Sequence, residues 1–196
     1  MVAETGDGRP QRHAQRRGKG RRREPDPNAD LGPDADPESF ARQILLRRLT
    51  DQPRSRADLA QALAQRDVPG DVATAVLDRF EEVGLIDDEE FARSWVQSRQ
   101  RSRGLAGRVL AQELRRKGID DELIRDTVAE IDPESEELAA RALVQKKLRS
   151  LRQVDEAKKT QRLVGMLARK GYSGGLAYKV VREEIGLDAA VDWESL

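Results

Sequence analysis

The amino-acid sequence repeats itself three times, and this repetition constrains the fold more than any other feature. A shift of 51 residues places residues 40–42 on residues 91–93, both Phe-Ala-Arg. A further shift of 53 residues places residues 116–118 on residues 169–171, both Arg-Lys-Gly. Leucines recur at equivalent positions as well: Leu59, Leu110 and Leu163, then Leu63, Leu114 and Leu167. Repeats of about 20–50 residues are typical of stacked supersecondary units, none of which buries its apolar face alone.

Each unit is predicted to contain three helices. In the first unit, apolar residues follow one another at three- and four-residue spacing in three stretches, which is the period of a helix face. The stretches are Phe40, Ile44, Leu45, Leu49; Leu59, Ala62, Leu63; and Val72, Val76, Leu77, Phe80, Val83. Ala and Leu number 44, against 25 for Val, Ile and Thr, and unbranched side chains favour helices. We therefore expect an all-α protein whose three tandem three-helix repeats form an elongated, curved, right-handed-type helical stack.

Capping residues set the expected boundaries of the units. Asp-Pro-Glu-Ser occurs at 36–39 and again at 132–135, where Asp can cap free amides and Pro suits the first helical position. The third unit has about six extra residues, so its first two helices are expected to be longer. The predicted organisation is a tail and linker over 1–38, repeats over 39–88, 89–133 and 134–190, and a C-terminal tail over 191–196.

The first 38 residues lack the apolar side chains of a core. Residues 1–23 carry eight basic and two acidic side chains, and residues 24–38 carry six acidic side chains among four prolines. This composition predicts a disordered basic tail followed by an extended linker. The tail either has no partner of its own or serves as a non-specific arm for nucleic-acid phosphates.

Charge alternates in step with the repeat, although the net charge is zero. Residues 58–90 carry ten acidic and two basic side chains, and residues 91–117 carry one acidic and eight basic. Residues 118–137 and 138–170 repeat this alternation. Stacked units would then place first and second helices on a basic edge and third helices on an acidic one, which suits a partner of alternating charge. The alternative is that so charged a chain simply exposes both signs.

Composition excludes several classes of function. The chain has no Cys and a single histidine, His13 in the tail, so thiolate metal sites, cysteine nucleophiles and serine triads lack their central residue. We expect a protein that is not an enzyme and needs no cofactor. No apolar run approaches the roughly 18 residues of a membrane span, and no apolar segment near the N-terminus resembles a signal peptide. A cytoplasmic protein without a membrane partner is expected.

One alternative interpretation concerns the first unit. Residues 55–88 resemble a winged helix-turn-helix, which would make the protein a DNA-binding transcriptional regulator. The recognition helix, however, would span roughly residues 71–83 with four acids against one arginine, and acidic side chains repel phosphates. Where the β-wing should follow Ile86, Asp87 instead predicts the start of another helix.

Two strings in the middle of the chain resemble a known family. Residues 84–88, Gly-Leu-Ile-Asp-Asp, and residues 113–119, Glu-Leu-Arg-Arg-Lys-Gly-Ile, are similar to those of the RecX regulators of the recombinase RecA. Further similarities are Arg54-Ser55, Phe91-Ala92, Arg99, Gly104, Arg108, Lys158-Lys159, Arg162-Leu163 and Arg169-Lys170-Gly171-Tyr172. The resemblance covers residues 39–188, and the basic tail lies outside it.

The resemblance implies a function that the residues alone do not specify. A RecX-like protein would bind RecA and its filament on single-stranded DNA, and would inhibit recombinase, ATPase and coprotease activities in DNA repair. The basic edge and the N-terminal tail would add weak direct DNA binding. Eleven cations are predicted to contact the partner: Arg99, Arg103, Arg108, Arg115, Arg116, Lys117, Lys158, Lys159, Arg162, Arg169 and Lys170. The alternative is that these cations only form solvated helix faces.

Overall fold

The computed structural model describes residues 36–186, and this part of the chain is entirely helical. Unit 1 contains α1 (Pro37–Asp51), α2 (Arg56–Ala64) and α3 (Gly70–Glu82). Unit 2 contains α4 (Asp88–Arg103), α5 (Gly107–Arg116) and α6 (Asp121–Ala129). Unit 3 contains α7 (Pro133–Leu148), α8 (Glu156–Arg169) and α9 (Gly174–Ile185). The prediction of an all-α protein with three three-helix units is confirmed. The predicted N-terminal tail, except for its last three residues, and the predicted C-terminal tail lie outside the described residues.

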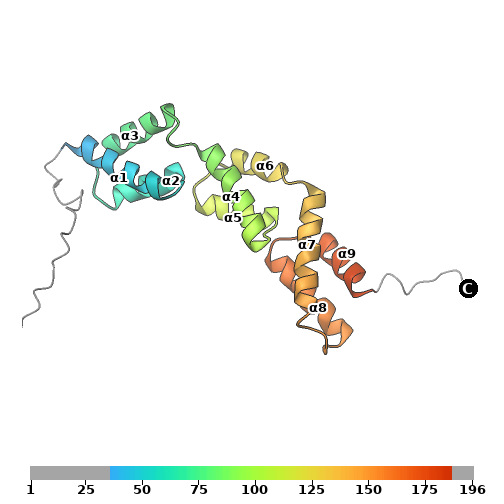
Figure 1. Cartoon of the computed structure of the whole chain (residues 1–196). Helices are drawn as coiled ribbons and strands as arrows, with labels where there is room; N and C mark the ends of the chain where they lie inside the picture. Colours follow the sequence, from blue (N-terminus) through green and yellow to red (C-terminus); the bar gives the residue numbers. More distant parts are fainter. Residues whose placement is uncertain (1–35, 187–196) are drawn as a thin grey trace, which may run out of the picture.

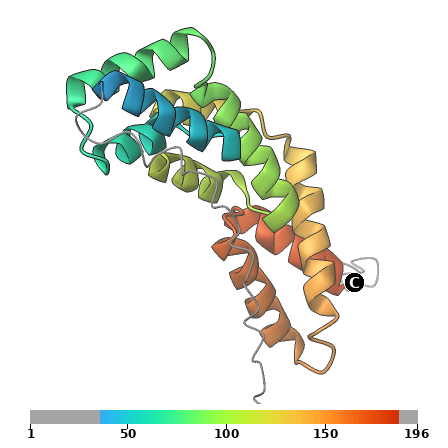
Figure 2. The same cartoon turned by 60° about the vertical axis from the view of Figure 1, so that its left-hand side comes forward.

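The three units follow one another in an elongated, bent row (Figures 1 and 2). Every helix pair that shares an extensive contact lies within a single unit. Each unit accordingly has its own apolar cluster, and two joints connect the units. The hand of the stack stays a prediction.

The repeated leucines form the centres of these clusters. Leu59, Leu110 and Leu163 are fully buried, one in each unit, and so are their companions Leu63, Leu114 and Leu167. Each pair lies on the second helix of its unit, four residues apart and therefore on one face. Burying one leucine side chain contributes about 1.5–3 kcal/mol, so conservation of these positions between repeats follows from packing.

Capping at the helix starts agrees with the sequence pattern. The side chains of Asp36 and Asp132 accept hydrogen bonds from backbone amides of α1 and α7, and both helices have proline in the first turn. Asp87 caps α4 in the same way by accepting from the amide of Glu90 at 2.8 Å. Helix α1 thus starts at Pro37, inside the range predicted for the linker.

The expectation of longer helices in unit 3 was right for its second helix and wrong for its first, and the expectation for Val83 was wrong. Helix α8 is longer than α5, with 14 residues against 10, but α7 has 16 residues, as α4 does. The inserted residues therefore extend the second helix and the turn before it, where Leu151 is buried. Val83, predicted to face the core, is 61% exposed because α3 ends at Glu82.

Helix α4 occupies the segment where a winged helix-turn-helix would have its wing. Over residues 36–186 there is no strand that could form such a wing. Within the same residues, no helix is both long and apolar enough to cross a lipid bilayer.

Candidate interaction surface along the second helices

The second helices of the three units run end to end. The C-terminal end of α8 meets the start of α5, where the amide of Ala106 donates to the carbonyl of Lys170 at 2.9 Å. The C-terminal end of α5 meets the start of α2, where the hydroxyl of Ser55 donates to the carbonyl of Lys117 at 2.7 Å. In Figure 2, α8 (orange), α5 (yellow-green) and α2 (teal) follow one another along one side of the molecule. Of these helices, α5 and α8 carry cations of the predicted basic edge, whereas α2 carries one arginine and one aspartate.

The joint between units 1 and 2 is largely polar. The ammonium of Lys117 lies 2.8 Å from a carboxylate oxygen of Asp58, with both side chains mostly shielded from solvent. Ser55 is fully buried and caps α2 while its hydroxyl donates across the joint. The amide of Arg56 donates to Asp88, the first residue of α4, at 2.8 Å, and burial raises the pKa of the Asp88 carboxyl.

The joint between units 2 and 3 uses equivalent positions but makes different contacts. Besides the bond between Ala106 and Lys170, the hydroxyl of Tyr172 donates to the carbonyl of Gly104 at 3.2 Å. The ammonium of Lys170 donates to the carbonyl of Arg103. A Cβ added to Gly171 would stand 2.8 Å from the amide nitrogen of Val109, so the two units touch through their backbones.

These joints explain why Arg-Lys-Gly occurs twice. In each copy the lysine and glycine end the second helix of one unit and contact the start of the second helix in the preceding unit. Within residues 36–186 no unit precedes unit 1, and there the position of the glycine is taken by Asp67, which keeps a positive φ of 57°. Sequence reasoning interpreted the string as a binding surface and missed the joint. The signal was available, since the string is missing from unit 1, the first of the described units.

Arg99 and Lys117 flank Trp95, which is partly buried. The guanidinium carbon of Arg99 lies 4.1 Å from the centre of a Trp95 ring, and the ammonium of Lys117 lies at 5.4 Å. The indole nitrogen donates to Glu113 at 2.9 Å, and Arg99 approaches the same carboxylate at 3.4 Å. Arg103 adds a distant ion pair with Glu113 at 3.9 Å. Cation–π contacts and ion pairs thus engage these cations within the protein.

The eleven predicted contact residues therefore fall into two groups. Those with a contact inside the chain are Arg99, Arg103, Arg115, Lys117 and Lys170, where Arg115 pairs with Asp121 at 2.8 Å. The others form no ion pair with any described residue: Arg108, Arg116, Lys158, Lys159, Arg162 and Arg169. We call this second group the basic row; all its members are exposed except Lys159, which is half-buried.

Helical spacing aligns part of the basic row. Lys158, Arg162 and Arg169 follow one another at intervals of four and seven residues on α8, which places them on one face. Arg108 and Arg116 lie near the two ends of α5, which continues the line from α8. The structure thus places cations that are 42 to 61 residues apart in the sequence on two consecutive helices of one line.

Comparison with known proteins decides the family. Three family models match in chain order: the first three-helix domain of RecX over residues 41–80, the second over 87–128 and the third over 135–181. The chain belongs to the RecX family. RecX relatives match along most of their own length as well: a protein of Streptomyces coelicolor named Regulatory protein RecX is 54% identical over 153 residues, covering 78% of this chain and 81% of the relative.

Other RecX proteins are similar to this chain over a comparable length. Relatives of the same name from Thermobifida fusca and Mycolicibacterium smegmatis are 50% and 49% identical, covering 79% and 76% of this chain and 84% and 81% of their own. A crystal structure of RecX from Lactobacillus salivarius superposes with a TM-score of 0.71 at 22% identity, over 76% of this chain and 97% of that one. A second RecX crystal structure gives 0.69 at 28% identity, over 76% and 73%.

Proposed function

We propose that this protein binds RecA and its filament on single-stranded DNA, and inhibits the recombinase, ATPase and coprotease activities of that filament. Membership of a family of regulatory proteins is the observation that carries the proposal. The described residues support it with an elongated body that carries exposed cations on two helices, α5 and α8, that run end to end. Such a surface recognises extended, negatively charged partners and depends on salt concentration.

The basic row is proposed as the contact surface. Its side chains are exposed and have no internal ion pair to break, so an approaching carboxylate or phosphate need not displace an existing partner. Lys117 and Lys170 hold the joints instead, and their part in binding is to keep the segments of the row in line. We expect DNA phosphates of the filament to contribute, because Arg and Lys on a helix face bind phosphates without sequence preference.

A titration into RecA, ATP and single-stranded DNA tests the proposal. We expect ATP turnover to fall as the protein is added, and the variant Arg116→Glu/Arg162→Glu/Arg169→Glu to need at least about tenfold more protein for the same inhibition, since each lost contact to a charged group contributes about 1 kcal/mol. Arg125→Glu is the matched control, because Arg125 is exposed on the acidic helix α6. Unchanged turnover at saturating protein would exclude inhibition, and equal potency of the triple variant would exclude the basic row.

A further inference from the structure

The first helix of every unit carries the same ion pair. A glutamate in its first or second turn meets an arginine four residues later, at 2.5 Å in unit 1, 2.6 Å in unit 2 and 2.7 Å in unit 3. The pairs are Glu38–Arg42, Glu89–Arg93 and Glu137–Arg141. The units can therefore be compared by the further ion pairs that this arginine forms in each of them.

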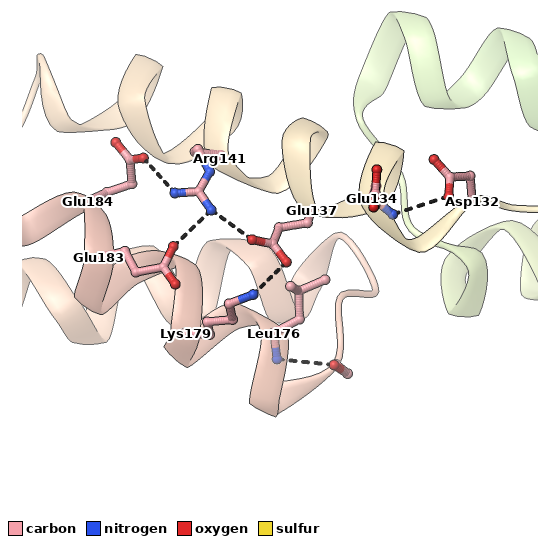
Figure 3. Close-up of polar contacts among 9 residues, drawn as sticks. Asp132, Glu134, Glu137, Arg141, Leu176, Lys179, Glu183 and Glu184 are labelled. Carbon is pink, nitrogen blue, oxygen red and sulfur yellow. Dashed lines mark hydrogen bonds and ion pairs between the residues drawn. The ribbon is translucent and has the colours of Figure 1, made fainter. Parts of the chain in front are cut away.

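In units 2 and 3 this arginine also bridges to the third helix. Arg93 reaches Glu130, the residue that follows α6, at 3.4 Å, and Arg141 reaches Glu183 of α9 at 2.8 Å. Figure 3 shows Arg141 surrounded by the carboxylates of Glu137, Glu183 and Glu184. The bridges hold the first helix against the third and neutralise the arginine.

Unit 1 lacks the carboxylate of this bridge. The position of Glu130 and Glu183 is held by Arg79, so a second cation takes the place of the carboxylate. Arg79 has no ion pair with any described residue. Both arginines line an open groove of about 610 Å³ between α1 and α3. Of the groove's own acids, Glu38 already binds Arg42 and Asp78 binds Arg56 at 2.5 Å, which leaves Glu82.

The same groove also has exposed apolar side chains. Leu46, Val83 and Leu85 line it and are 46%, 61% and 50% exposed. The positions equivalent to Leu46 in the other units are the glutamines Gln97 and Gln145, which suit a solvated surface. Exposed apolar side chains grouped in a hollow beside unpaired charge are typical of a surface that another segment covers.

We propose that this groove binds residues 187–196 of a second copy of the chain. That segment combines two kinds of group that suit the groove. Its apolar side chains (Leu187, Val191, Trp193 and Leu196) match the exposed apolar lining, and its carboxylates (Asp188, Asp192 and Glu194) match Arg79, which has no ion pair with any described residue. One carboxylate takes the place of Glu130 and Glu183 by bridging Arg42 and Arg79, while the apolar side chains cover Leu46, Val83 and Leu85.

The segment comes from another molecule because the two ends of the row are far apart. Helix α9, after which residues 187–196 follow, belongs to unit 3, at the opposite end from the groove in unit 1 (Figure 1). Ten residues reach at most about 35 Å even when fully extended. Contact of unit 3 with unit 1 of the next molecule is head to tail, and such contacts form chains unless rotation closes them into a ring.

A labelled peptide of residues 187–196 and sedimentation of the full chain test the proposal together. We expect the peptide to bind the full-length protein, and the protein to associate with increasing concentration. Arg79→Glu introduces the residue that units 2 and 3 have, so it should form the missing ion pair with Arg42 and raise or preserve the melting temperature. It should also weaken peptide binding and self-association at least about tenfold. Arg66→Glu, at an exposed position of the same unit outside the groove, is the matched control.

Each outcome decides the proposal. Trp193→Ala in the full chain should reduce association without changing the groove. A protein that stays monomeric to about 100 µM and ignores the peptide overturns the inference. Binding that is unaffected by Arg79→Glu, or equal for a peptide of the same composition in scrambled order, overturns it as well. None of these measurements requires RecA, so they stand apart from the test of inhibition.

Discussion

A Cβ at position 118 would stand 2.3 Å from the Cβ of Ala57 in the preceding unit, so only glycine fits there. Gly118 also has a positive φ of 72°. The positive φ and the close approach should each destabilise a side chain at this position, and the two contributions can be separated. A positive φ is unfavourable for any L-residue, whereas a steric conflict arises only where a neighbour is close.

We predict that Gly118→Ala lowers the free energy of unfolding by about 2–4 kcal/mol, the sum of the backbone cost and a steric conflict across the joint. Gly84→Ala is the control, because Gly84 has a similar φ of 70° with nothing within 4 Å, and should cost about 1–2 kcal/mol. Urea unfolding of both variants measures the difference. Equal losses would mean that the close approach contributes nothing.

Replacing Lys117 should loosen the joint between units 1 and 2. Lys117→Gln removes the ion pair with Asp58 and one cation beside Trp95, which we expect to cost about 1 kcal/mol and to change the emission of Trp95. Arg116→Gln, one residue away and without an ion pair among the described residues, should change neither quantity. The Trp193→Phe background removes the second tryptophan from the fluorescence signal.

Tyr172 should make the stability of the joint between units 2 and 3 depend on alkaline pH. Burial raises the pKa of its hydroxyl from 10.0 to about 12. Because the folded state favours the protonated form, the stability that this group contributes is fully present below pH 10 and is lost as pH rises towards about 12. The difference in phenolate absorbance between the protein and Tyr172→Phe should therefore rise near pH 12. A rise near pH 10 in the folded protein would contradict the burial.

The Arg141 network should make unit 3 sensitive to acid. Hydrogen bonds from Lys179 and then Arg141 lower the pKa of the Glu137 carboxyl from its ordinary value of 4.5. A lowered pKa contributes stability that is present above pH 4.5 and is lost as pH falls through the folded value. Urea unfolding at pH 7 and pH 3.5 should show a larger loss for the protein than for Glu137→Gln. Parallel losses would show that the carboxylate contributes nothing to this dependence.

The basic row shows where reasoning from the sequence reached its limit. The sequence named Lys158, Arg162 and Arg169 as candidates, and their common face follows from their spacing along one helix. It could not separate Arg116 from Lys117, which are adjacent in the same string. Their difference lies in Asp58, a residue of another unit that meets Lys117 only after the units dock.

The sequence by itself determined the number of units, their helical class, their caps and their buried leucines, because each of these depends on local spacing and on residues a few positions apart. Only the tertiary structure decided which cations hold joints and which stay exposed. It also decided that Arg79 lies in the groove of unit 1 without an ion pair among the described residues. Those outcomes depend on side chains tens of residues apart, whose attraction becomes strong only when folding brings their charges within a few ångströms of each other.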